Sequence, residues 1–120
     1  MYTTSANTHD RLVKALVDKF GKEGWTVQAD GIGHPNGSPD PIDGFVPDMI
    51  AWKHGETPII AEAENCDSIY SEHTRKQWTA FAKVIGYKFH VIIPKSCFAS
   101  AQQQATEWGI RVDYWWHLDV

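Results

Sequence analysis

The sequence is poor in cysteine and shows no excess of positive charge. Its 120 residues include two cysteines, Cys66 and Cys97, which have no metal-binding spacing. The 11 Lys and Arg are outnumbered by 15 Asp and Glu, and the resulting net charge of −4 argues against tight, non-specific binding to nucleic acid.

Long apolar runs are also missing, and none approaches the length of a membrane span. The N-terminus lacks the basic and apolar regions of a signal peptide. We therefore expect a cytoplasmic protein without membrane contact, in which both cysteine thiols stay reduced. With 42% hydrophobic and 22% charged residues, residues 1–120 are expected to form a single globular domain.

Two apolar, β-rich runs, Phe45–Trp52 and Pro58–Glu64, flank a short turn and predict a β-hairpin. The hairpin contains Asp48, Glu62 and Glu64. Carboxylates are normally excluded from a strand core unless they are paired or bind a metal, because removing water from them is costly.

The faces of these carboxylates depend on the loop. Glu62 and Glu64 leave the same face of a strand because they are two residues apart. A five-residue loop from His54 to Pro58 would pair Lys53 with Ile59 and place Asp48 opposite Glu64, on that same face. A loop of two or four residues would place Asp48 on the other face. The hypothesis of a shared acidic face therefore requires an odd loop or a bulge.

The segment Pro47-Asp48, thirteen residues and then Glu62-Ala63-Glu64 resembles the PD-(D/E)XK signature of restriction enzymes, Holliday-junction resolvases and repair nucleases. Glu64 stands where that pattern has lysine, a departure also known in some restriction enzymes. The resemblance implies that Asp48, Glu62, the Ala63 carbonyl and Glu64 form a metal site. Oxygen ligands of this kind favour Mg²⁺ or Mn²⁺.

A first helix is predicted from Asn7 or Thr8 to Phe20, ending near Gly21 or Gly24. Its apolar stripe comprises Leu12, Val13, Leu16, Val17 and Phe20. His9 falls at the centre of this stripe and Asp10 at its edge, which is unusual for such polar residues. The first helix of the resembled family often gives an acidic residue to the site, and the resemblance makes His9 and Asp10 candidates. The alternative is a solvated first turn.

A second helix is predicted from Ile69 to about Gly86, after a cap within residues 65–68. His73 and Gln77 fall on its predicted inward face, one turn apart. Two polar residues stacked beside an acidic cluster favour a catalytic role, and many members of the resembled superfamily carry a Gln or Lys there. The alternative for a single buried histidine is a satisfied core group.

The other segments complete the expected fold. A strand is predicted over 25–29 and a long loop over 30–44, which we expect to form a flap with His34 and Asn36 as phosphate contacts or to be a plain surface loop. A buried strand (88–94), a third helix (96–108) and a strand (111–118) follow. The order αβββαβαβ predicts an α/β fold in which helices flank a mixed central sheet, and it is the core order of the resembled restriction-endonuclease-like family.

The leading hypothesis is a Mg²⁺- or Mn²⁺-dependent endonuclease that hydrolyses phosphodiester bonds in nucleic acid, with DNA favoured over RNA. Its candidate catalytic residues are Asp48, Glu62, Glu64, His73, Gln77, Asp10 and His9. The alternatives are a nuclease-like binding module with little catalysis, acting in a larger complex, and a metal-dependent hydrolase of another small substrate. A homodimer would allow one small domain to act on two strands.

Overall fold

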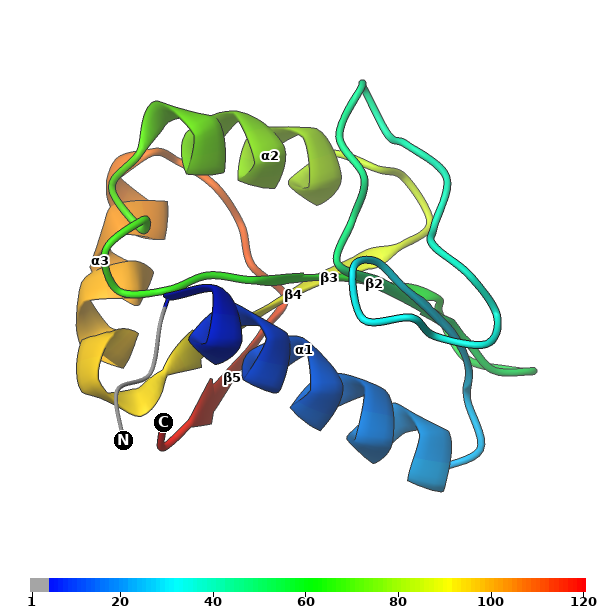
Figure 1. The fold of residues 1–120 in the computed structure, drawn as a ribbon. Helices are drawn as coiled ribbons and strands as arrows, with labels where there is room; N and C mark the ends of the chain where they lie inside the picture. Colours follow the sequence, from blue (N-terminus) through cyan, green and yellow to red (C-terminus); the bar gives the residue numbers. More distant parts are fainter. Residues whose placement is uncertain (1–4) are drawn as a thin grey trace.

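The computed structural model describes residues 5–120, which form one sheet covered by helices (Figure 1). The elements in chain order are α1 (Ser5–Lys22), β1 (Thr26–Ala29), β2 (Met49–Trp52), β3 (Ile59–Ala63), α2 (Glu72–Ala82), β4 (Lys88–Pro94), the 3₁₀ turn η1 (Lys95–Cys97), α3 (Phe98–Glu107) and β5 (Tyr114–Leu118). No helix in this part of the chain is long and apolar enough to cross a membrane.

The five strands lie in the order β1-β2-β3-β4-β5. The first three form an antiparallel meander. Strand β4 then pairs in parallel with β3, and β5 pairs in parallel with β4, each after a helical connection. The prediction of a mixed sheet flanked by helices is confirmed. Because antiparallel β2 begins where β3 ends, residues at these two points lie side by side.

Two apolar layers hold the helices on the sheet. On one face, α1 packs through Leu12, Val13, Leu16 and Phe20, which are all buried, as the predicted stripe requires. On the other face, α2 and α3 cover β3 and β4 through Trp78, Phe81, Ala101 and Ala105. Figure 1 shows α1 and α2 on opposite sides of the sheet.

The hairpin register differs from the predicted one by two residues. Ala51 pairs with Ile59 and Met49 with Ala61, so the connection between the paired residues has seven residues rather than five. Its length is still odd, and this keeps Asp48 on the face of Glu62 and Glu64. Asp48 now lies opposite Glu62, whereas we had expected Glu64.

Helix α2 is shorter than predicted and is rotated about its axis. It begins after Ser71, whose hydroxyl accepts a hydrogen bond from the Thr74 amide, and its buried residues include Thr74, Trp78 and Phe81. His73 is exposed and Gln77 is half-buried. The prediction that His73 faces the core is therefore wrong: the large indole of Trp78 takes the inward position instead.

The long loop after β1 packs against the outer edge of that strand. The Asn36 side-chain amide donates to the Val27 carbonyl (2.8 Å), and the Ala29 amide donates to the Gly37 carbonyl (3.1 Å). The His34 ring accepts from the Asn36 amide at 3.1 Å. Asn36 thus holds the loop on β1, whereas His34 bonds within the loop. The expected contact of His34 and Asn36 with phosphate stays a prediction.

Cys66 and Cys97 form a disulfide, which corrects the expectation of two reduced thiols. Their separation of 31 residues gave no sequence signal, because the pairing depends on β3 and β4 lying side by side. Cys66 follows β3 and Cys97 ends η1, directly after β4. The bond ties the segment that carries Glu64 and Ser68 to the start of α3.

Reduction of this disulfide should lower the free energy of unfolding by about 3–4 kcal/mol, because it releases a loop of roughly 30 residues in the unfolded chain. Denaturant unfolding with and without a dithiol reductant measures the loss. The Cys66→Ser/Cys97→Ser double variant should show the lower stability and no response to the reductant. Two freely reactive thiols in the air-oxidised native protein would contradict the assignment.

Because His90 is buried, we expect the folded protein to lose stability in acid. Its Nδ1 accepts a hydrogen bond from Trp116 Nε1 at 3.0 Å, and burial lowers the pKa of His90 from 6.5 to about 4, although Asp113 opposes this shift. Because the unfolded chain binds the proton more tightly, stability should fall as pH drops from 6.5 towards 4, by up to about 3 kcal/mol. Unfolding free energies at pH 7 and 4.5 test this. His90→Asn keeps an acceptor and should lose less; an equal loss would contradict the role of His90.

Candidate active site at the start of β2 and the end of β3

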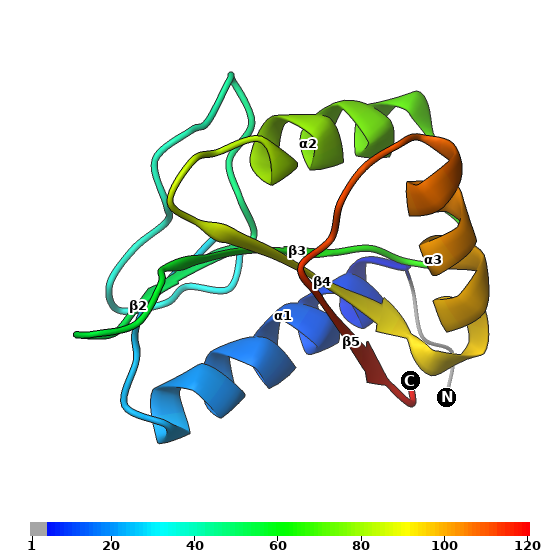
Figure 2. The ribbon, with the colours of Figure 1, turned by 180° about the vertical axis from the view of Figure 1, so that it is seen from behind.

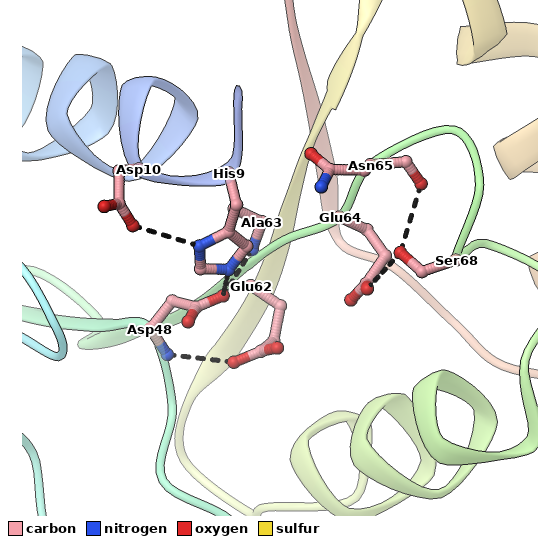
Figure 3. A network of polar contacts seen from close by, with 8 residues as sticks. All are labelled: His9, Asp10, Asp48, Glu62, Ala63, Glu64, Asn65 and Ser68. Atoms are coloured by element: carbon pink, nitrogen blue, oxygen red, sulfur yellow. Dashed lines mark hydrogen bonds and ion pairs between the residues drawn. The ribbon is translucent and has the colours of Figure 1, made fainter. Parts of the chain in front are cut away.

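The site is built around the carboxyl groups of Asp48 and Glu62 (Figure 3). Asp48 directly precedes β2, and Glu62 lies within β3, where it is only 2% exposed. The Asp48 amide donates to Glu62 Oε1 at 2.9 Å, and the Ala63 amide donates to Asp48 Oδ2 at 2.8 Å. Each carboxylate therefore accepts a hydrogen bond from the backbone of the other side of the hairpin.

Helix α1 contributes His9 to this pair. His9 Nε2 lies 3.1 Å from Asp48 Oδ2, and His9 Nδ1 lies 3.5 Å from Asp10 Oδ1. The hydrogen bond to Asp48 is the main cause that raises the pKa of His9 from 6.5 to about 9, against the opposing effect of burial. His9 is therefore protonated at neutral pH and donates to both carboxylates.

Glu62 strongly prefers its neutral form. Burial is the largest cause that raises its pKa well above 4.5, and the negative charge of Asp48 adds to the effect. The hydrogen bond from the Asp48 amide opposes both. A carboxyl group in such surroundings needs either a proton or a cation nearby.

Glu64 follows β3, and its carboxylate is turned towards the next loop (Figure 3). The Ser68 hydroxyl donates to Glu64 Oε1 at 2.7 Å. Burial raises the pKa of Glu64 from 4.5 to about 7, while the hydroxyls of Ser68 and Thr74 lower it. Glu64 can thus exchange a proton with solvent near neutral pH.

The structure brings together part of the predicted site. Asp48, Glu62 and the Ala63 backbone lie together, with His9 and Asp10 beside them, whereas Glu64 is held by Ser68. No hydrogen bond joins His73 or Gln77 to these carboxylates, and the His73 ring packs on Phe45 with 5.7 Å between ring centroids. Within residues 5–120, no three side chains of His, Cys, Asp or Glu converge as a formed metal cluster.

Ser68 and Thr74 were missed by the sequence reasoning as partners of the site. Residues 65–68 had been interpreted as the helix cap, but the cap is Ser71. The Thr74 hydroxyl donates to the Ser68 carbonyl at 2.8 Å, which fixes the turn that presents Ser68 to Glu64. The sequence offered one signal for this contact: Ser68 lies four residues after Glu64, an expected site carboxylate.

No protein-family model, curated protein or solved structure matches this chain. The interpretation of the site therefore depends on its own geometry and chemistry.

Replacing Glu64 tests whether burial makes ionisation of this side chain unfavourable in the folded protein. Because its pKa is higher in the folded chain than the ordinary value of 4.5, ionisation of Glu64 opposes folding, and stability is lost as pH rises from 4.5 through about 7. Glu64→Gln keeps an acceptor for Ser68 and should raise the unfolding free energy at pH 8 by about 1–2 kcal/mol, with little effect at pH 4.5. Thermal or urea unfolding at both pH values measures the difference.

Glu56→Gln is the matched control, because Glu56 is an exposed carboxylate in the connection between β2 and β3. It should leave the pH profile unchanged. A Glu64→Gln variant as pH-sensitive as the wild type would show that Glu64 ionises without cost.

Proposed function

We propose that the protein is a metal-dependent nuclease that hydrolyses phosphodiester bonds in nucleic acid. The observation that carries the proposal is the buried pair of Asp48 and Glu62, which are joined by a hydrogen bond between neighbouring segments of the hairpin. Two ionised carboxylates in this position would destabilise the fold, because both lose water and repel each other. A divalent cation would offset that cost. The resemblance of residues 47–64 to the PD-(D/E)XK signature agrees with this interpretation.

The donor set fits a small, hard cation. The backbone amides bond to Asp48 Oδ2 and Glu62 Oε1, and the two carboxyl groups also share a side-chain hydrogen bond. A cation would replace the shared proton and take one oxygen of each carboxylate as a ligand. These two oxygens and the Ala63 carbonyl would hold Mg²⁺ or Mn²⁺, ions that keep several waters when they bind to few protein ligands. When bound, the ion would supply a Lewis acid for attack on a phosphodiester.

The protein's own groups supply positioning and proton transfer. His9 holds Asp48 in place through its Nε2, and Asp10 orients the other side of the ring. Glu64, with a pKa of about 7, is matched to accept a proton from a water at neutral pH. Ser68 holds the Glu64 carboxylate in the position from which it would do so.

A cavity of about 340 Å³ lies between residues 43–45 and α2. Arg75, Lys76 and Lys83 line it together with two acids: Arg75 pairs with Glu72 at 3.6 Å and Lys83 pairs with Asp43 at 3.1 Å. Basic side chains are thus present at this cavity despite the net charge of −4. His73 and Gln77, on the same helix, are proposed to contact the substrate rather than the metal.

One observation favours a second candidate, a nuclease-like binding module. Among the described residues, His9 is the only basic side chain that contacts Asp48, Glu62 or Glu64, and Glu64 occupies the position of the signature lysine. A site without that fixed positive charge gives less stabilisation to the transition state. Metal binding without cleavage is the behaviour expected of such a module.

The proposal is tested by incubating the protein with plasmid, single-stranded and branched DNA and with RNA, in the presence of Mg²⁺ or Mn²⁺. Asp48→Asn and Glu62→Gln should each reduce cleavage at least about 100-fold, because each removes a charge that holds the cation. EDTA should abolish cleavage, and Glu56→Gln should leave it unchanged. Full activity of either site variant would overturn the site assignment. Intact substrates alongside calorimetric binding of Mn²⁺ would favour the binding module.

A further inference from the structure

The two edge strands of the sheet differ in how the rest of the chain covers them. At the β1 edge, the loop after β1 covers the strand: the Asn36 side chain bonds to the Val27 carbonyl, and the Ala29 amide bonds to the Gly37 carbonyl. At the other edge, β5 pairs with β4 on one side, and no backbone hydrogen bond from residues 5–120 reaches its outer side. Figure 2 shows β5 as the outermost strand.

The sequence of β5 lacks the usual protection of a free edge. Natural edge strands are blunted by Lys, by Pro, by a bulge or by a covering segment, since their open N–H and C=O groups attract another strand. The five residues Tyr-Trp-Trp-His-Leu contain no charge, no proline and no glycine. Tyr114 is 53% exposed, and Trp115, Trp116 and Leu118 are only half-buried. Such a strand is suited to pair with another β-strand.

Charged residues at the two ends of β5 favour a second copy of this chain as the partner strand. Arg111 precedes the strand with its side chain 88% exposed and pairs with Asp113 at 3.1 Å, and Asp119 follows the strand, also exposed. Each lies four residues from Trp115. A second copy in antiparallel orientation, related by a two-fold axis beside Trp115, would bring Arg111 of each copy opposite Asp119 of the other. A parallel copy would place like charges together and would not close into a dimer.

We propose that β5 is a homodimer interface, in which two copies of β5 pair antiparallel across a two-fold axis and join the two sheets into one. Aromatic side chains from Tyr114 to Trp116 would then face their counterparts across the axis, where cross-strand aromatic pairs add to the backbone bonds. The inference uses none of the site residues, so it stands or falls independently of the proposed nuclease activity.

Light scattering coupled to size-exclusion chromatography tests the proposal over concentrations from about 1 µM to about 1 mM. The mass should rise from 13.6 kDa towards twice that value. Tyr114→Lys and His117→Lys, which place charge on exposed positions of β5, should weaken dimerisation at least tenfold. Tyr70→Lys changes a tyrosine of similar exposure outside β5 and should have no effect.

A charge exchange tests the antiparallel arrangement. Arg111→Glu or Asp119→Lys alone should weaken the dimer about tenfold, and the double variant should restore it. Circular dichroism at each step shows that the variants remain folded. A monomer at every concentration, or a dimer indifferent to the β5 lysines, would overturn the proposal. Equal dimerisation by all the charge variants would overturn the antiparallel pairing.

Discussion

Burial of the Glu62 carboxyl group beside Asp48 is the constraint on which the site depends. An ionised carboxylate that is 2% exposed next to another acid is unfavourable by several kcal/mol unless a proton, a donor or a cation compensates. The chain provides two backbone amides and the His9 ring, and these stabilise Asp48 more fully than Glu62. Burial beside Asp48, with this smaller compensation, raises the pKa of Glu62 well above its ordinary value.

The fold delivers these groups from three separate elements. Helix α1 packs on one face of the sheet through its apolar stripe, and its first turn reaches past the start of β2 to place His9 against Asp48. The hairpin supplies Asp48 and Glu62 from facing strands. The segment after β3 supplies Glu64 and Ser68, and the disulfide between Cys66 and Cys97 ties this segment to η1. The apolar layers and this covalent bond therefore hold together three carboxyl groups that repel one another, with His9 and Ser68 as their partners.

Sequence reasoning succeeded where a local pattern determines which side chains are buried. The stripe of α1 was predicted correctly, and β4 has the predicted bounds of Lys88 and Pro94. The shared face of Asp48 and Glu62 followed from an odd hairpin connection, although its length was two residues longer than expected. The prediction for α2 failed because Trp78 and Phe81 give the helix its buried side, and this packing rotates His73 into solvent.

The sequence by itself determined the α/β architecture and the apolar stripe of α1, because these depend on periodicity. It left the shared face of the three carboxylates open, because that face depends on the length of the hairpin connection, which the structure decided. Only the tertiary structure decided that His9 contacts Asp48, that Ser68 holds Glu64 and that Cys66 bonds to Cys97. These partners are distant in sequence or lie across irregular turns. Their approach is fixed by how helices and strands pack, and no local pattern encodes it.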